Sequence, residues 1–510
     1  MVVGERSYDI VVLPAEMENL NAPTAELLTR YLEAGGRVMS LSDGLRYVDG
    51  KASDEPARLA GAHSANWLAR PLEAALPDLT AHCAPDIQFS DLEGDRSMFF
   101  HQRRVLGDAE LVFLANVSPD RSMTGRFVSR AKSVEIWDPF TGKASAYACE
   151  PLQDSAAVSF NLPAGGSALF CLRPKKAGRL DERKGRWGEL VPDGEPTIKA
   201  DSAEVLTIDH CDLKMGNTIE KDLYFYEAQR KTFRRHGLDR NPWDNAVQYK
   251  TRILDLDTFG PDTGFEATFW FEVDPAVDPS TFKVVVERPH LYEVSINGRK
   301  VECAGGEWWL DRAFGLFGIG GNGKSGRNAI TLRSSPFTIH TELEPVYVLG
   351  DFGLEVAEKG FRIVPAVPLV LGAWSEQGRP FRAEGVSYSK TYGLSAPDPE
   401  KERIIVRLGE WRGAVAEIKV GGRSAGFIFA APYELDITDF IAAGENTVIV
   451  TVFGTLKNTL GPHHNNPPLG TAWPGMFQKG PEGGYPPGSA YSVVGYGLFE
   501  DFKLLSKSLN

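Results

Sequence analysis

Three tryptophans of this chain lie in polar, turn-rich segments, where an indole ring can face a ligand. Trp374 precedes a polar turn, Trp411 lies in a turn flanked by glycines, and Trp473 lies in the Pro- and Gly-rich stretch 461–491. Aromatic rings stack on the C–H faces of sugars, so all three are candidates for carbohydrate contact, although each also fits a cap over the edge of a β-sandwich. Three further tryptophans lie in or beside strand-like sequence and are expected in hydrophobic cores: Trp270, Trp308 and Trp309.

The adjacent histidines His463 and His464 open the same stretch. In an extended segment, neighbouring side chains point to opposite sides, which is poor geometry for joint binding of one metal ion. In a structural interpretation, one imidazole packs under the loop and the other is exposed. In a functional interpretation, one of them hydrogen-bonds a sugar hydroxyl or a neighbouring domain. We favour the structural role, keep both residues as candidate carbohydrate contacts, and predict no metal site.

Asp209, His210 and Asp212 carry acid–base groups in a strand-like pattern. Successive side chains of a strand face opposite sides, so Asp209 and His210 are predicted not to point together. We therefore expect a surface edge strand here, not a catalytic site. The acids of the following region are spread through turn-like sequence and are expected to be solvated: Asp239, Asp244, Asp255 and Asp257.

Catalysis of glycoside hydrolysis is not expected within this chain. That reaction uses two carboxyl groups about 5–10 Å apart. In a barrel enzyme they stand at the C-terminal ends of the strands. The chain lacks the eight strand–helix alternations of such a barrel, so no catalytic residue is predicted. The glycine-rich run 318–326 lacks the spacing of a phosphate-binding loop, and no Gly-x-Ser-x-Gly elbow occurs.

The composition is typical of a turn-rich β protein. The 510 residues are 42% hydrophobic and include 52 glycines and 33 prolines, enough for roughly three or four domains. The net charge of −13 argues against nucleic-acid or anionic-membrane partners. No apolar run could span a membrane, and no signal peptide opens the chain. The five cysteines are odd in number and lack metal-binding spacing, so we expect buried free thiols.

Residues 1–85 are predicted to form a partial α/β domain. Segments 8–13 and 37–41 are strand-like, and apolar residues of 23–34 share one helical face, which together indicate a parallel βαβ unit. A further helix is expected around 66–76, although Pro71 falls inside it.

Residues 86–175 are predicted to form a small β-sandwich. Its expected strands lie at 110–116, 133–137, 156–162 and 167–172. The next segment, 176–200, is rich in charge and poor in apolar periodicity, and we interpret it as a linker.

Two copies of one antiparallel β domain follow, at 201–358 and 359–510. A hairpin at Asn297–Gly298 matches one at Gly421–Gly422, and strands beginning after Asn328 and Asn446 match each other at an offset of 118 residues. Residues 264–332 and 385–452 are therefore expected to superpose. The proline-stiffened stretch 461–491 is expected to pack along an edge of the second copy and to project toward a catalytic module.

The second copy resembles a known family. Pro432–Tyr433, Asp436–Ile437–Thr438 and the turn at Gly444 resemble galactose-binding-like jelly rolls of glycoside hydrolases. The continuation 456–464, LKNTLGPHH, is similar to the C-terminal region of glycoside hydrolase family 106, the α-L-rhamnosidases.

The resemblance implies a mainly β fold, with a small α/β portion followed by a β-sandwich and two tandem jelly rolls. It covers the ancillary part of that family, whose carboxylates and calcium site lie in an upstream barrel, and a full-length member is expected to be secreted or periplasmic. We therefore expect a non-catalytic portion of an α-L-rhamnosidase-like enzyme that acts on plant or microbial polysaccharide. The alternative is a stand-alone carbohydrate-binding or structural β-sandwich protein.

Overall fold

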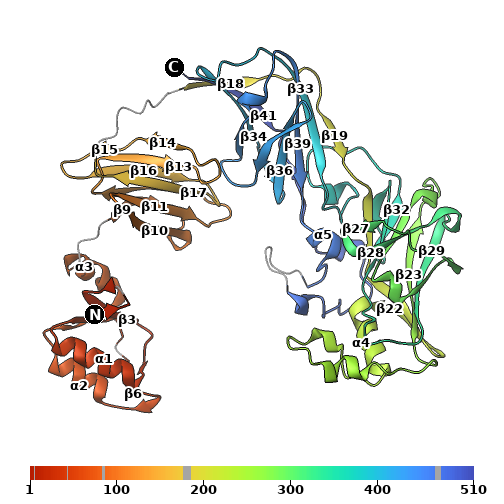
Figure 1. The fold of residues 1–510 in the computed structure, drawn as a ribbon, viewed down its shortest axis with the longest axis horizontal. Helices are drawn as coiled ribbons and strands as arrows, with labels where there is room; N and C mark the ends of the chain where they lie inside the picture. Colours follow the sequence, from red (N-terminus) through yellow and green to blue (C-terminus); the bar gives the residue numbers. More distant parts are fainter. Residues whose placement is uncertain (5, 43, 83–86, 176–184, 466–472, 510) are drawn as a thin grey trace. The chain divides into compact units, whose positions relative to one another are not determined.

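The computed structural model describes residues 1–510 except 5, 43, 83–86, 176–184, 466–472 and 510. The chain is mainly β and divides into two compact units, Met1–Glu182 and Arg183–Asn510 (Figure 1). No described helix has the length and apolar character needed to cross a bilayer. Cys149, Cys171, Cys211 and Cys303 are free thiols, and Cys83 lies outside the described residues.

The first unit begins with an α/β portion. Strands β3 (Ile10–Leu13), β5 (Arg37–Ser40) and β8 (Trp67–Ala69) pair in parallel. Helix α1 (Ala22–Glu33) buries Leu28 and Leu32, so the βαβ prediction is confirmed. The helix expected around 66–76 is instead β8 followed by α3 (Leu72–His82), because the ring of Pro71 fits the start of a helix but not its interior. Helix α2 (Glu55–Ala62) lies between β5 and β8 in sequence.

The rest of the first unit is a two-sheet sandwich. One sheet has the order β10-β11-β17-β13-β14 and the other β15-β16-β12-β9. Phe127, Phe160 and Phe170 fill the space between them. The strands are β9 (Ile87–Glu93), β10 (Phe99–Leu106), β11 (Ala109–Asn116), β12 (Met123–Ser129), β13 (Ser133–Trp137), β14 (Ala144–Tyr147), β15 (Glu150–Pro151), β16 (Ala156–Leu162) and β17 (Ser167–Arg173).

The second unit holds two jelly-roll sandwiches. The sheets of the first have the orders β20-β30-β24-β28-β27 and β22-β21-β23-β29-β25-β26. The strands are β20 (Glu204–Ile208), β21 (His210–Met215), β22 (Thr218–Tyr224), β23 (Phe265–Val273), β24 (Lys283–Glu287), β25 (Glu293–Ile296), β26 (Arg299–Lys300), β27 (Trp308–Trp309), β28 (Asp311–Gly318), β29 (Gly326–Ser334) and β30 (Val346–Gly350). Helix α4 (Phe225–Arg235) follows β22, and the pair β31 (Gly353–Val356) and β32 (Phe361–Val364) joins β23.

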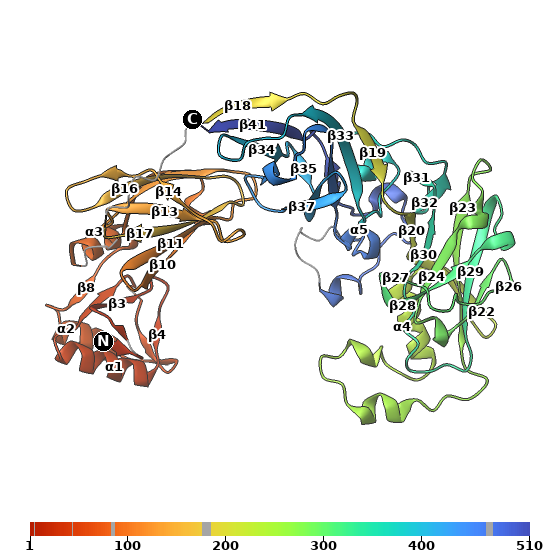
Figure 2. The ribbon, with the colours of Figure 1, turned by 45° about the horizontal axis from the view of Figure 1, so that its top comes forward.

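The sheets of the second jelly roll have the orders β18-β41-β34-β38 and β19-β33-β39-β36-β37. Figure 2 shows β18 lying along β41. The strands are β18 (Gly185–Leu190), β19 (Thr197–Ala200), β33 (Val386–Leu394), β34 (Glu402–Arg407), β36 (Val415–Val420), β37 (Arg423–Ile428), β38 (Glu434–Asp436), β39 (Gly444–Phe453) and β41 (Lys503–Leu509).

The two jelly rolls have the same strand order. The run β23-β29-β25-β26 corresponds to β33-β39-β36-β37, and the Asn297–Gly298 and Gly421–Gly422 hairpins join the last two strands of each run. The turns before β29 and β39 also match atom for atom. Asn328 bonds the backbone of Lys324 and Gly326, and Asn446 bonds that of Ala442 and Gly444. The two jelly rolls therefore share one topology over these strands.

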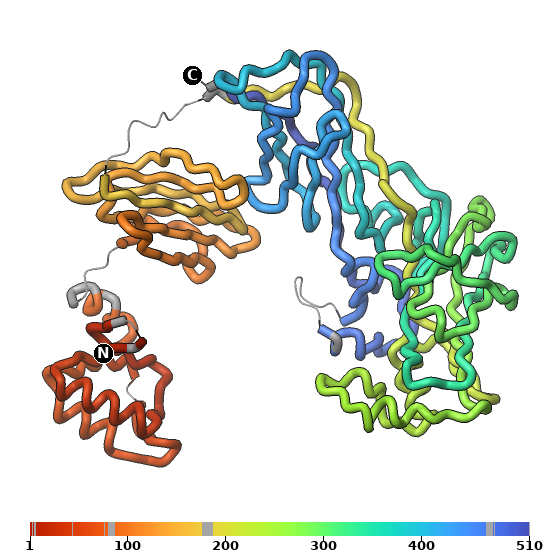
Figure 3. Tube along the Cα trace, in the orientation of Figure 1, coloured from red at the N-terminus to blue at the C-terminus, as the bar shows by residue number. Residues whose placement is uncertain are grey.

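The prediction of a linker over 176–200 is wrong for its described part. Strand β18 pairs with β41, and β19 pairs with β33, so both belong to the second jelly roll although they precede the first in sequence. The tube in Figure 3 shows this yellow segment beside the blue C-terminal strand. The charged side chains of this segment form no apolar pattern from which a strand could be predicted. Its strands are fixed by backbone hydrogen bonds to residues about 200 to 300 positions away in sequence.

The tryptophans expected in cores are only partly covered. Trp308 is 53% exposed on the short edge strand β27, and Trp309 and Trp270 are half-buried. The guanidinium of Arg327 covers the Trp270 ring at 3.8 Å. A strand at the edge of a sheet has a neighbouring strand on one side only, so its side chains are partly open to solvent. Trp308 lies on such a strand.

Candidate functional site

The described part of the stretch 461–491 packs against the first jelly roll. It leaves the second jelly roll after the short helix α5 (Lys457–Leu460), beside which the Thr207 hydroxyl donates to the Thr459 carbonyl at 2.8 Å. Farther along, Gly360 forms a bridge with Pro487. The expectation that this stretch follows an edge of the second jelly roll is therefore wrong, because its polar partners lie on the first.

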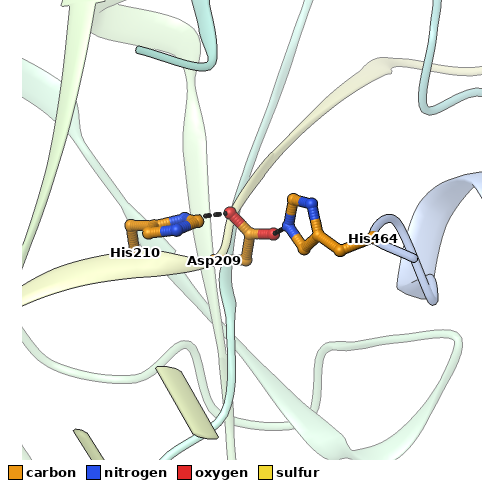
Figure 4. Close-up of side chains that lie close together, drawn as sticks. All are labelled: Asp209, His210 and His464. Carbon is orange, nitrogen blue, oxygen red and sulfur yellow. Dashed lines mark hydrogen bonds and ion pairs between the residues drawn. The ribbon is translucent and has the colours of Figure 1, made fainter. Parts of the chain in front are cut away.

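The buried carboxylate of Asp209 anchors the stretch (Figure 4). Its Oδ1 accepts from His210 Nδ1 at 2.8 Å and from the Tyr491 hydroxyl at 2.7 Å, and its Oδ2 accepts from His464 Nε2 at 2.8 Å. Burial alone would raise the pKa of this carboxyl. The hydrogen bonds from His210 and His464 outweigh burial and hold the pKa far below its ordinary value. An ionised carboxylate therefore joins one jelly roll to a stretch from the other.

The prediction that Asp209 and His210 point apart is wrong. Asp209 lies between β20 and β21, where the chain passes from one sheet of the first jelly roll to the other. The alternation of side chains holds within a strand and does not extend across such a crossing. The His210 ring stacks on the Tyr485 ring, with centroids 4.0 Å apart and planes at 4°.

Both histidines of the adjacent pair are buried, contrary to the prediction of one buried and one exposed. His464 bonds Asp209, whereas His463 Nε2 donates to the Asn458 carbonyl at 2.7 Å. The rings of Phe381 and Tyr491 lie against His463, so this extended segment has protein on both sides. Burial lowers the pKa of His463 to about 4.

The Asp209 cluster does not fit the calcium ion that the family resemblance places in a barrel. Among the described residues, the ligand atoms of Asp209, His210 and His464 lie within 4.8 Å of one another. Calcium takes six to eight oxygen ligands, whereas this group offers two imidazoles and a carboxylate whose two oxygens already accept hydrogen bonds. The cluster is a hydrogen-bond network that holds the stretch in place.

The anchored stretch forms one wall of a cavity of about 500 Å³, which we call the acidic pocket. The first jelly roll and α4 supply the remaining walls. The lining residues are Phe225, Tyr226, Gln229, Asn241, Asp244, Glu287, Phe314, Glu342, Glu344, Pro345, Tyr347, Leu460, Trp473, Phe477 and Gln478. The pocket thus combines aromatic rings with four carboxyl groups.

The carboxyl groups of the acidic pocket differ in their partners. Glu342 pairs with Arg288 at 2.7 Å and accepts from Asn241 at 2.9 Å, and Asp244 accepts from the Tyr226 hydroxyl at 2.7 Å. Burial, followed by the charges of Glu287 and Glu342, raises the pKa of the Glu344 carboxyl well above its ordinary value. A protonated carboxyl can donate a hydrogen bond as well as accept one, so the pocket can serve both kinds of hydroxyl interaction.

Of the five residues predicted to contact carbohydrate, Trp473 lines the acidic pocket, and it is 57% exposed. His463 and His464 are buried and are not among the residues that line the pocket. Trp374 is 1% exposed in the core of the second jelly roll, where Nε1 donates to the Tyr388 hydroxyl at 2.9 Å. Trp411 is half-buried in β35 (Trp411–Arg412), which pairs with β40 (Gly497–Leu498), and its ring meets the Tyr433 ring edge-on.

Sequence reasoning missed most of the pocket. Asp244 is exposed, as expected, and also lines the cavity, whereas Asp257 is half-buried and accepts bonds from Thr338 and Ile339. The pair Glu342 and Glu344, two residues apart beside a strand, is the one local signal that points to the site. The partners of Glu342, Arg288 and Asn241, lie more than fifty residues away in sequence.

No protein-family model and no curated protein matches this chain. Solved structures that resemble it include a rhamnosidase from Novosphingobium sp. PP1Y, at 14% identity and a TM-score of 0.44, over 98% of this chain and 33% of that one. An α-L-rhamnosidase from Streptomyces avermitilis, complexed with L-rhamnose, matches at 12% identity and a TM-score of 0.23, over 82% and 39%. A β-D-mannosidase from Dictyoglomus thermophilum matches at 11% identity and a TM-score of 0.21, over 49% and 31%. The chain thus spans about a third of the length of the first of these structures, and its structural neighbours include rhamnosidases and other glycoside hydrolases.

Proposed function

We propose that this chain is a non-catalytic portion of a glycoside hydrolase, of the α-L-rhamnosidase type, and that it binds carbohydrate in the acidic pocket. The observation that carries the proposal is the exposed indole of Trp473 facing a cavity of about 500 Å³ that also holds four carboxyl groups. Sugar sites are usually concave, with aromatic surface for the C–H face and a few fixed polar groups for the hydroxyls.

The size and lining of the pocket support a binding role. A cavity of this volume lies within the range of small-molecule sites, about 300–1,000 Å³. Phe225, Phe314 and Tyr347 supply further aromatic surface. Glu342 and Asp244 are held in place by Arg288 and Tyr226, which fixes hydrogen-bonding groups before a ligand arrives and lowers the cost of binding.

The same contacts support a non-catalytic role. General acid–base catalysis requires a carboxyl that is free to exchange a proton with the reacting groups. Glu342 is tied to an arginine and Asp244 to a tyrosine, so two of the four carboxyls are committed to structural partners. The resemblance of 456–464 to the family's C-terminal region supports the same view.

The alternative is a stand-alone carbohydrate-binding or structural protein. Parallel sheets are normally covered on both faces, yet Val12 of β3 is 39% exposed. Tyr8 and Leu27 of the same α/β portion are 49% and 50% exposed. Apolar surface on a parallel sheet favours an accessory part that packs against a further module.

The test is a pair of tryptophan variants with similar exposure. Trp473→Ala removes the ring that lines the pocket, whereas Trp308→Ala removes a ring that is 53% exposed on β27 and does not line it. Loss of one aromatic contact of about 1–1.5 kcal/mol weakens binding about tenfold. Isothermal titration calorimetry with rhamnose-containing and other plant oligosaccharides is expected to show this loss for Trp473→Ala and no change for Trp308→Ala.

A hydrolysis assay on the same three proteins separates binding from catalysis. Neither the chain nor its variants should hydrolyse an aryl α-L-rhamnoside faster than a heat-inactivated control. Two results would overturn the proposal. One is hydrolysis that a single carboxylate substitution in this chain abolishes, and the other is a glycan affinity that does not change in Trp473→Ala. The melting temperature of Trp473→Ala should stay close to that of the wild type, because more than half of this side chain is already in contact with solvent.

A further inference from the structure

We infer that the acidic pocket prefers a sugar unit that carries a protonated amino group over the corresponding neutral sugar, and that it rejects the corresponding sugar acid. This inference rests on the proposed function, because it names the class of ligand for the same pocket. Its basis is the charge of the lining, the fact that Glu344 has no partner among the described residues, and the aromatic rings that line the same cavity.

The ionisable side chains that line the pocket are all acids or phenols. They are Asp244, Glu287, Glu342, Glu344, Tyr226 and Tyr347, and no lysine, arginine or histidine is among the described lining residues. Arg288 lies beside the pocket and pairs with Glu342 at 2.7 Å. Arg288 also pairs with Glu287 at 4.0 Å, so one cation serves two of the four carboxyls, and a carboxylate on a ligand would meet an excess of like charge.

Glu344 is the carboxyl best placed to receive a cation. It makes no ion pair or hydrogen bond among the described residues, in contrast to Glu342 and Asp244. Burial, followed by the charges of Glu287 and Glu342, raises its pKa well above the ordinary value, although the charge of Arg288 acts in the opposite direction. An ammonium group at this position forms the charge-assisted hydrogen bond that the protein itself leaves unmade.

The aromatic lining favours the same ligand. A cation close to the face of an aromatic ring is attracted by the electrons of the ring, and tryptophan gives the strongest effect. Trp473, Phe314 and Tyr347 surround the carboxyls in one cavity. The rings that take the C–H face of any sugar therefore add attraction for a sugar that bears positive charge.

Binding of an amino sugar should release a proton from the protein. The groups that act on Glu344 are the acids Glu287, Glu342 and Asp244, the cation Arg288, and the phenols Tyr292 and Tyr347. The raised pKa means that the Glu344 carboxyl holds its proton to higher pH than an ordinary glutamate. A bound ammonium favours the ionised form, so the affinity should rise as the pH rises through that pKa, and calorimetry in buffers of different ionisation enthalpy should register proton release.

The experiment compares two series of three trisaccharides that differ in charge. The probes are the oligomers of glucosamine, glucose and glucuronic acid, together with the corresponding galactosamine, galactose and galacturonic acid series. Each probe competes for the full chain against a labelled glycan whose binding depends on Trp473. In at least one series, the amino sugar is expected to compete at least ten times more strongly than the neutral sugar, and the acid is expected not to compete.

A charge-neutral substitution tests the residue. In Glu344→Gln, the ratio of the neutral-sugar to the amino-sugar dissociation constant should fall from ten or more to about one. Glu302→Gln, at a site that is 85% exposed and outside the pocket, should keep the wild-type ratio. Amino sugars that compete no better than neutral ones in both series, or a ratio that survives in Glu344→Gln, overturns the inference and leaves the proposed function standing. If no glycan binds in a Trp473-dependent way, the proposed function itself has failed.

Discussion

Replacing Asp209 by asparagine should loosen the stretch that forms one wall of the acidic pocket. Asn keeps the shape of the side chain and removes its charge. Asp209 accepts three hydrogen bonds, from His210, His464 and Tyr491, at 2.7–2.8 Å. A bond to an ionised group contributes about 1.5–3 kcal/mol and a neutral one about 0.5–1.5 kcal/mol, so each bond loses about 1 kcal/mol.

Two of these bonds, from His464 and Tyr491, go to the stretch, so the loss is about 2 kcal/mol, which is roughly a thirtyfold rise in the population in which the stretch has come away. Two backbone amides report on that opening. The Ser492 amide donates to the His463 carbonyl at 2.8 Å, and the Gly360 amide donates to the Pro486 carbonyl at 2.8 Å. Hydrogen exchange measured by mass spectrometry on peptides that contain these amides should show protection factors lowered about thirtyfold.

The matched control is Asp212→Asn, the same substitution three residues along. Asp212 accepts from the Asp222 amide and from Trp270, and none of its described hydrogen bonds goes to the anchored stretch. Its variant should leave exchange at Ser492 and Gly360 as in the wild type. Equal protection in Asp209→Asn and Asp212→Asn would show that the buried carboxylate does not hold this wall.

Three further results are expected. Because His463 has a pKa of about 4 when folded and about 6.5 when unfolded, the unfolded chain gains a proton first as the pH falls. Local stability should then drop by about 1.4 kcal/mol per pH unit between pH 6.5 and 4, a slope that exchange measurements should find missing in His463→Gln. Glu204→Gln weakens the buried pair with Arg382, whose Nε lies 2.8 Å from the carboxylate, and should lower the free energy of unfolding of the second unit by about 3–5 kcal/mol in urea titrations. Asn446→Ala removes three turn hydrogen bonds and should cost about 2–4 kcal/mol, and Asn328→Ala removes the same three together with the bond from Asn297, so it should cost about 0.5–1.5 kcal/mol more; a lower cost for Asn328→Ala would contradict the equivalence of the two turns.

Features that depend on near neighbours were predictable from the sequence. Asn328 and Asn446 bond backbone groups two and four residues away, and the Asn297–Gly298 hairpin joins adjacent strands. Such contacts leave a trace in local residue types, because a tight turn needs particular residues at particular positions. The repeat and the mainly β fold were therefore predictable.

The anchor and the pocket depend on contacts between distant segments. Asp209 meets His464 and Tyr491 across separations of 255 and 282 residues, and Trp473 shares a cavity with Tyr226 and Glu287. Periodicity reports which face of an element is apolar, and it does not tell which other element covers that face. The strand β18 was missed for the same reason, since its partner β41 lies at the far end of the unit.

The placement of β18 and β19 ahead of the first jelly roll has a consequence for synthesis of the chain. These strands leave the ribosome early, yet β19 needs β33 and β18 needs β41. About 300 residues separate β18 from β41, and translation at about 5–20 residues per second takes about 15 to 60 seconds to make them. The first jelly roll has all its own strands by Val364 and can fold within that time, whereas the second must keep β19 unpaired until β33 appears and β18 unpaired until β41, its last strand, appears. An early stop codon before β41 therefore spares the first jelly roll and leaves the second without the strand that joins β18 to β34.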